Sequence, residues 1–164
     1  MKHLSDEIAR ELSEVAAQAM RERMEHNAIV SVYDRLQAKL MPRLGGDDAL
    51  ETELRRRVAE WKFYLLSTRD CPENELRELY RQIEELGYST LEKEATIGIC
   101  YAQFCLKVRT PADAETKLRE AKARLDSAAE AAIDSNASSY YRDLARTVAQ
   151  WLARLEQADR GAAS

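Results

Sequence analysis

The chain of 164 residues has the length of one domain, and its composition already narrows the fold. Apolar residues make up 45% and charged residues 33%, which excludes a disordered acidic tail, and five Gly and three Pro are too few for the many tight turns of a β-sandwich or barrel. The formal net charge is −4, whereas proteins that bind nucleic acids generally carry an excess of basic residues, so we expect no nucleic-acid partner.

Apolar spacing predicts two helical stretches near the start of the chain. Residues 4–25 carry apolar side chains three and four positions apart, and the stripe changes phase near His26–Asn27 before it resumes. Two helices, or one helix with a defect, both fit this pattern. Residues 41–48 hold a Pro and the only Gly-Gly pair, which predicts a loop. We therefore expect residues 1–44 to form an N-terminal amphipathic helical region.

The remaining residues, 45–164, predict a second helical domain that packs with the first region into one compact unit. Pro72 suits the first turn of a helix and Gly87 its end, and residues 89–92 have the S-x-x-E form of a capping box. The helix after this box is apolar nearly all round, which predicts a central position in the domain. The helices expected here cover 50–65, 72–86, 90–109, 111–134 and 139–159, with a turn at 134–138.

The fold class that these patterns predict is all-α. No stretch alternates between apolar and polar residues for long enough to form a strand. The expected architecture is a succession of six or seven antiparallel helices.

Residues 49–160 resemble, in fragments, a tetratricopeptide-type helical repeat. Residues 97–101 have the form of its first-helix signature, L-G-x-x-Y, and residues 121–128 match the small-large-small pattern of its second helix. A step of 34 residues back from Gly98 reaches Tyr64. Tyr64 and Ala145 stand where a glycine is usual, and Pro111 lies in a displaced loop between the helices. A tetratricopeptide-like array and an unrelated helical bundle are both compatible with the sequence.

The resemblance also implies where a partner would bind, because ligands of such repeats lie along the inner face formed by the first helix of each unit. Four cations and one amide on an acidic protein would favour an acidic peptide or a C-terminal carboxylate. The alternative is that these side chains pair with neighbouring acids, for example Arg69 with Glu73. The implied partner-binding positions are Lys62, Arg69, Gln103, Arg142 and Arg146.

The residues that usually carry catalysis or bind metals are sparse. The three cysteines, at positions 71, 100 and 105, form no disulfide framework and no metal-ligand spacing, so we expect free thiols, two of them in the core. His3 and His26 are the only histidines, and no nucleophile or phosphate-binding motif occurs. We expect no metal, no cofactor and no enzymatic activity, although an unrecognised catalytic site stays a minor alternative.

The basic run Arg55–Arg57 is predicted to be a solvated face that pairs with Glu51, Glu53 and Glu60, because its members fan out around the helix. The charged N-terminus lacks the apolar region of a signal peptide, and the longest uncharged run, residues 95–106, is too short to span a membrane. Together with the free cysteines, these features favour the cytoplasm.

Function is the weakest inference from the sequence. We expect a non-catalytic protein-interaction module, a small cytosolic adaptor or chaperone that holds a peptide or a partner helix. The alternative is a self-associating structural subunit, in which residues 1–44 pack against their copy and assembly is itself the function.

Overall fold

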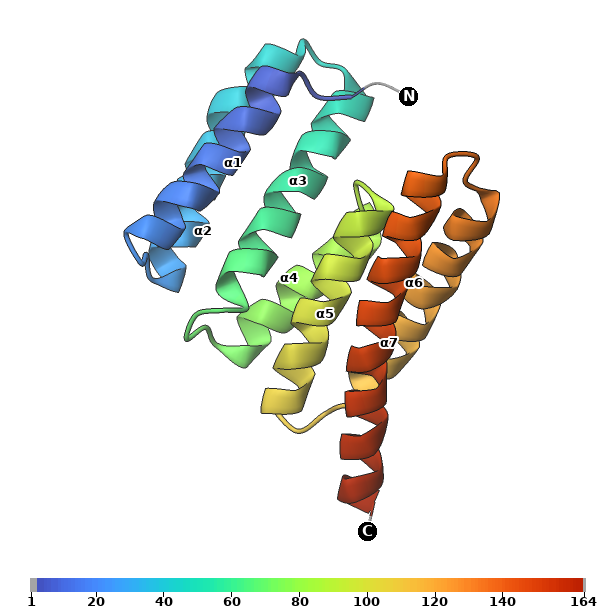
Figure 1. The fold of residues 1–164 in the computed structure, drawn as a ribbon. Helices are drawn as coiled ribbons and strands as arrows, with labels where there is room; N and C mark the ends of the chain where they lie inside the picture. The colour runs from blue at the N-terminus through green and yellow to red at the C-terminus, as the bar shows by residue number, and fades with distance from the viewer. Residues whose placement is uncertain (1–2, 164) are drawn as a thin grey trace. The chain divides into compact units, whose positions relative to one another are not determined.

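A computed structural model describes residues 3–163 and confirms the all-α prediction. The described residues form seven α-helices and one short 3-10 helix, and none of them lies in a strand (Figure 1). The chain divides into two compact units, one ending at Ser89 and the other beginning at Thr90. The boundary predicted between residues 44 and 45 falls inside the first unit, at the end of the 3-10 helix.

In the first unit, α3 is the helix that the others share. It packs against α1 and α2 and also against α4. The elements are α1 (Asp6–Arg21), α2 (His26–Leu40), the 3-10 helix η1 (Met41–Leu44), α3 (Asp48–Leu66) and α4 (Glu73–Leu86).

The first stretch forms two helices. Ser5 caps α1, since its Oγ accepts from the Ile8 N–H at 3.3 Å, and the helix ends at Arg21. Arg23, two residues further on, has a left-handed φ of 49° that an α-helix cannot accommodate. The helix is therefore four residues shorter than the predicted stretch, which ended at residue 25. The buried Tyr33 hydroxyl donates to the Leu12 carbonyl at 3.0 Å and joins α2 to α1.

The predicted loop at residues 41–48 is shorter than expected. Met41–Leu44 form the 3-10 helix, and Gly45 and Gly46 have φ of 63° and 75°, the left-handed region that glycine tolerates best. Asp47 caps α3, because its Oδ1 accepts from the Leu50 N–H at 3.1 Å. The acidic end of this segment therefore has a local structural role.

The second unit contains α5 (Leu91–Lys107), α6 (Ala112–Ala131) and α7 (Ser135–Ala163). Helix α5 packs against both α6 and α7, and eight of its 17 residues are buried, as the apolar pattern predicted. Cys100 and Cys105 belong to this buried set and form no disulfide with a described residue.

Two local predictions in this region are wrong. The cap of α5 is Thr90, whose Oγ1 accepts from the Lys93 N–H at 3.1 Å, whereas the Ser89 hydroxyl donates to Glu60. The expected turn at 134–138 is mostly helix, because Asp134 Oδ1 accepts from the Asn136 N–H at 2.9 Å and α7 begins at Ser135.

The helical hairpins recur at a longer spacing than the sequence suggested. Helices α1, α3, α5 and α7 begin at Asp6, Asp48, Leu91 and Ser135, which are 42, 43 and 44 residues apart. The 34-residue step does not join equivalent positions either, because Gly98 is buried whereas Tyr64 is 36% exposed. Packed neighbouring helices are compatible with a helical repeat of this longer period.

Helices α6 and α7 also share a buried acidic contact. Glu115 is only 9% exposed, and its Oε2 accepts from Arg119 Nη2 at 3.0 Å, while the same nitrogen lies 3.2 Å from Glu156 Oε1. Within the described part of the chain, Glu115 Oε1 has no hydrogen-bond partner. Burial, followed by the Asp159 carboxylate, raises the pKa of Glu115, although Arg119 opposes this shift.

We expect this contact to make the stability of the protein pH-dependent. Because the folded state raises the Glu115 pKa above its ordinary value of 4.5, the free energy of unfolding should fall as the pH rises from about 4.5 through the raised value. Melting temperatures measured across this range should fall less steeply for Glu115→Gln than for the wild type. Glu130→Gln, an exposed change on the same helix, should keep the wild-type slope. Equal slopes in all three proteins would contradict this role for Glu115.

Candidate functional site

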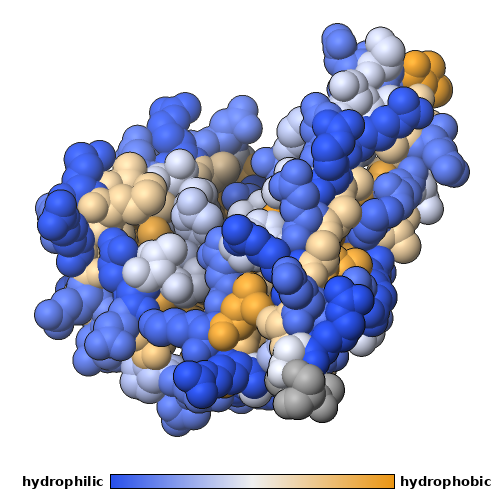
Figure 2. Space-filling view, turned by 60° about the horizontal axis from the view of Figure 1, so that its bottom comes forward, coloured by the Kyte–Doolittle hydropathy of each residue, from blue (hydrophilic) through white to orange (hydrophobic). Residues whose placement is uncertain are grey.

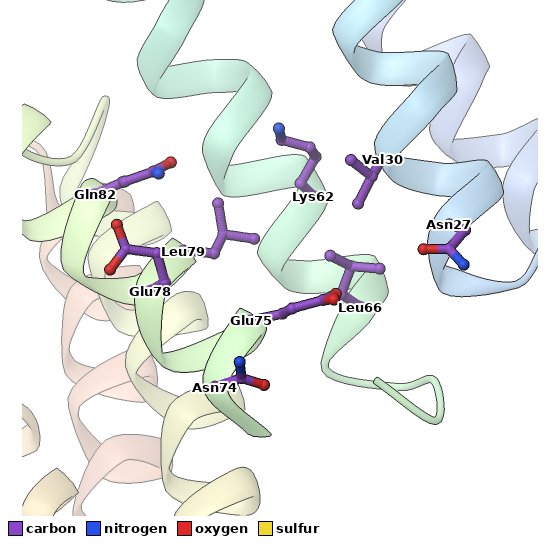
Figure 3. Close-up of a pocket in the computed structure, with 9 residues that line it drawn as sticks. All are labelled: Asn27, Val30, Lys62, Leu66, Asn74, Glu75, Glu78, Leu79 and Gln82. Atoms are coloured by element: carbon purple, nitrogen blue, oxygen red, sulfur yellow. The ribbon is translucent and has the colours of Figure 1, made fainter. Parts of the chain in front are cut away.

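The first unit carries a groove between α2, α3 and α4. It has a volume of about 440 Å³, within the range of roughly 300–1,000 Å³ that is usual for ligand pockets. Its floor is apolar and takes one side chain from each of three helices, Val30 of α2, Leu66 of α3 and Leu79 of α4 (Figure 3). The remaining lining residues are polar: Asn27, Lys62, Asn74, Glu75, Glu78 and Gln82.

Helical periodicity places the lining residues of α4 on the same side of that helix. On α4 the lining positions 74, 75, 78, 79 and 82 fall on one face, and Figure 3 shows this face opposite Val30 and Lys62. The arginines of α4 are not part of the lining. Arg77 pairs with Glu73 at 3.0 Å, and Arg81 pairs with both Glu78 and Glu85.

The groove carries an excess of negative charge. The Glu75 and Glu78 side chains are 50% and 53% exposed, and the hydrogen bond from Arg81 lowers the pKa of Glu78, which keeps that carboxylate ionised. The one ammonium in the lining, Lys62, is only 16% exposed, and its Nζ lies 2.9 Å from Asp34 Oδ1. The lining therefore holds two half-exposed carboxylates and one ammonium, and the ammonium is paired with Asp34 outside the lining.

Of the five positions implied by the resemblance, Lys62 lines the groove and Arg69 lies at a turn of the first unit. The Arg69 guanidinium donates to the Met24 carbonyl at 2.9 Å and to the Ala19 carbonyl at 3.4 Å, at the turn between α1 and α2. The suggested pairing of Arg69 with Glu73 is not the pairing seen, since Glu73 bonds Arg77.

The other three implied positions lie in the second unit. Gln103 of α5 is exposed, as are Arg142 and Arg146 of α7. Arg146 Nη1 lies 3.0 Å from Asp143 Oδ1, a pairing within one helix of the kind weighed as the alternative to a binding role. Partner binding at these three residues stays a prediction.

Arg69→Ala should lower the free energy of unfolding by about 1–2 kcal/mol, because two carbonyls at the end of α1 lose a charged donor. Arg142→Ala, an exposed change, should alter it by about 0.5 kcal/mol or less. Urea unfolding followed by circular dichroism measures both values. Equal stability of the two variants would contradict the structural role of Arg69.

Sequence reasoning missed most of the groove. Of its lining residues, the sequence singles out only Lys62 as a candidate for binding. Each helix alone reads as an ordinary amphipathic helix, and only packing brings the three segments together. Among the charges of the run Arg55–Arg57, the expected pairing is found at Glu53, which lies 3.0 Å from Arg57. The Glu60 carboxylate accepts from Ser89.

The rest of the surface shows weaker signs of a binding site. The view in Figure 2 is mostly hydrophilic, with apolar side chains in small separate patches. The large apolar side chains recorded as exposed come from separate segments: Met20, Tyr64, Ile133 and Tyr140. Across residues 3–163, no cluster of three or more His, Cys, Asp or Glu side chains could hold a metal ion. No helix in this part of the chain has the length and apolar character needed to cross a membrane.

Comparison with protein-family models, with curated proteins and with solved structures finds no significant match to this chain.

Proposed function

We propose that the protein is a non-catalytic interaction module that holds a segment of a partner protein in the groove between α2, α3 and α4. The observation that carries the proposal is the groove itself, an open depression with an apolar floor and a polar rim. An apolar surface framed by polar side chains is the usual form of a site that anchors a few partner side chains and orients them.

We further propose that the helical hairpins are degenerate repeats of the tetratricopeptide type, a class that serves as a scaffold for partners. The signature positions Gly98 and Tyr101 are buried in α5, and Ala121 and Leu125 are buried in α6, which supports this relation. The hairpins repeat every 42–44 residues, whereas the sequence suggested a repeat of 34 residues. The proposed relation therefore concerns the way the helices pack and does not extend to the repeat length. The free cysteines support a reducing compartment such as the cytoplasm, where an adaptor or chaperone would act.

Self-association is the second candidate function, and one observation favours it. Met20 on α1 is 49% exposed, and it falls in the region expected to join two copies. Sedimentation of the full chain at increasing concentration tests this candidate. Met20→Glu should reduce the mass of any oligomer that forms through α1, whereas a wild-type chain that stays monomeric would contradict self-association.

The groove proposal predicts which peptides the full chain selects from a displayed library of random sequences. Peptides enriched on the wild type should bind Val30→Glu about tenfold more weakly or worse, a loss of about 1.4 kcal/mol, because the new carboxylate stands in the apolar floor. Val32→Glu is the matched control. Val32 is also a partly exposed valine of α2, but it does not line the groove, so this variant should bind as the wild type does.

Binding constants from fluorescence anisotropy measure the two effects, and circular dichroism confirms that both variants are folded. Enrichment of no peptide, or an equal loss of binding in both variants, would contradict the groove as the binding site.

A further inference from the structure

We propose that the groove takes a positively charged amphipathic segment of its partner, with apolar side chains flanked by Lys or Arg. This inference rests on the proposed function and adds the chemistry of the partner. It reverses the sign expected from the sequence, where Lys62 and the arginines favoured an acidic peptide.

The apolar floor sets the first requirement on the partner. Leu66 and Leu79 are 2% and 8% exposed, and Val30 is partly exposed, so the floor presents only a small apolar surface. A partner can bury one or two apolar side chains there. Such a small surface gives limited affinity, so the polar rim has to contribute to the selection of the partner.

The charge of the rim sets the second requirement. Glu75 and Glu78 stand one helical turn apart on α4, both line the groove, and each side chain is about half exposed. Facing them from α2 is His26, whose Nε2 lies 3.8 Å from Glu75 Oε2. From α3 comes Lys62, which is already held by Asp34 at 2.9 Å. Among the residues that line the groove, two carboxylates, Glu75 and Glu78, therefore stand against one ammonium.

Arg81 does not cancel this excess. It pairs with Glu78, but it also pairs with Glu85 on the same helix and is not among the residues that line the groove. A cationic partner side chain can approach the free sides of Glu75 and Glu78, whereas an acidic one meets like charge. Complementary charge of this kind raises the association rate and suppresses partners of the wrong sign.

The test uses two short synthetic peptides with the same apolar residues, one with Lys and the other with Glu at all remaining positions. The full-length wild type should bind the Lys peptide at least about tenfold more tightly than the Glu peptide, and added salt should narrow the difference. The double variant Glu75→Lys/Glu78→Lys should reverse this preference. Glu120→Lys/Glu130→Lys makes the same charge change on exposed residues of α6, outside the groove lining, and should keep the wild-type preference.

Other binding results would overturn the charge inference alone or the groove proposal with it. Equal binding of the two peptides, binding of neither with a Kd below about 1 mM, or a preference that survives Glu75→Lys/Glu78→Lys overturns the cationic partner. If library peptides still lose affinity with Val30→Glu but carry neutral or acidic residues, the charge inference fails and the groove proposal stands. If the Lys peptide binds Val30→Glu as well as it binds the wild type, the site lies outside the groove and both proposals fail.

Discussion

Gly98→Leu should lower the free energy of unfolding by about 1–3 kcal/mol, because the new side chain overpacks the contact between α5 and α6. Gly98 is buried in α5, and a Cβ built on it would lie 3.0 Å from Cδ2 of Leu118 on α6. A single methyl group needs Leu118 to shift by only a few tenths of an ångström, but a leucine side chain has no such room.

Gly98→Ala is the control for this prediction. The end of the Leu118 side chain is flexible, and Ala gains up to about 1 kcal/mol over Gly in helix propensity, so the two effects should nearly cancel. Urea unfolding of the full chain, with amide exchange of α5 and α6, measures both variants. A Gly98→Leu protein as stable as the wild type would remove the close-contact interpretation and much of the support for the repeat.

Glu60→Ala should lower the free energy of unfolding by about 2–3 kcal/mol. Glu60 is only 3% exposed, and its carboxylate accepts from the Ser89 N–H at 2.8 Å and from the Ser89 hydroxyl at 2.6 Å. The alanine variant loses both charge-assisted hydrogen bonds and leaves the Ser89 donors without this acceptor at the end of the first unit.

Glu60→Gln separates the hydrogen bonds from the packing of the side chain. The amide keeps one oxygen acceptor and nearly the same volume, so the loss of stability should be smaller than for alanine. Faster exchange of the Ser89 amide should accompany the alanine change. A Glu60→Ala protein within about 0.5 kcal/mol of the wild type, with unchanged exchange of that amide, would contradict the role of this contact.

The helices themselves could be predicted from the sequence because local apolar spacing determines them. The ends were harder, because a cap depends on which polar group is free to make it. Ser89 has the sequence of a cap but is bound to Glu60, so Thr90 caps α5 in its place. Asp134 was assigned to a turn although its side chain starts α7.

The groove could not be predicted because its parts are distant in sequence and ordinary in character. Val30, Leu66 and Leu79 are ordinary apolar residues of three separate helices, and only the packing of α2 and α4 on α3 brings them to the floor of a shared groove. The partners of single charges could not be predicted either. Lys62 pairs with Asp34 across two helices, and Arg69 bonds backbone carbonyls.

The measurement that tests the groove most directly is a methyl NMR titration of the full chain with a peptide enriched on the wild type. We predict that the largest shift changes occur at the methyl groups of Val30, Leu66 and Leu79, and that those of Val32 change little. Shift changes confined to α5, α6 and α7, or equal changes at Val30 and Val32, would contradict a partner site between α2, α3 and α4.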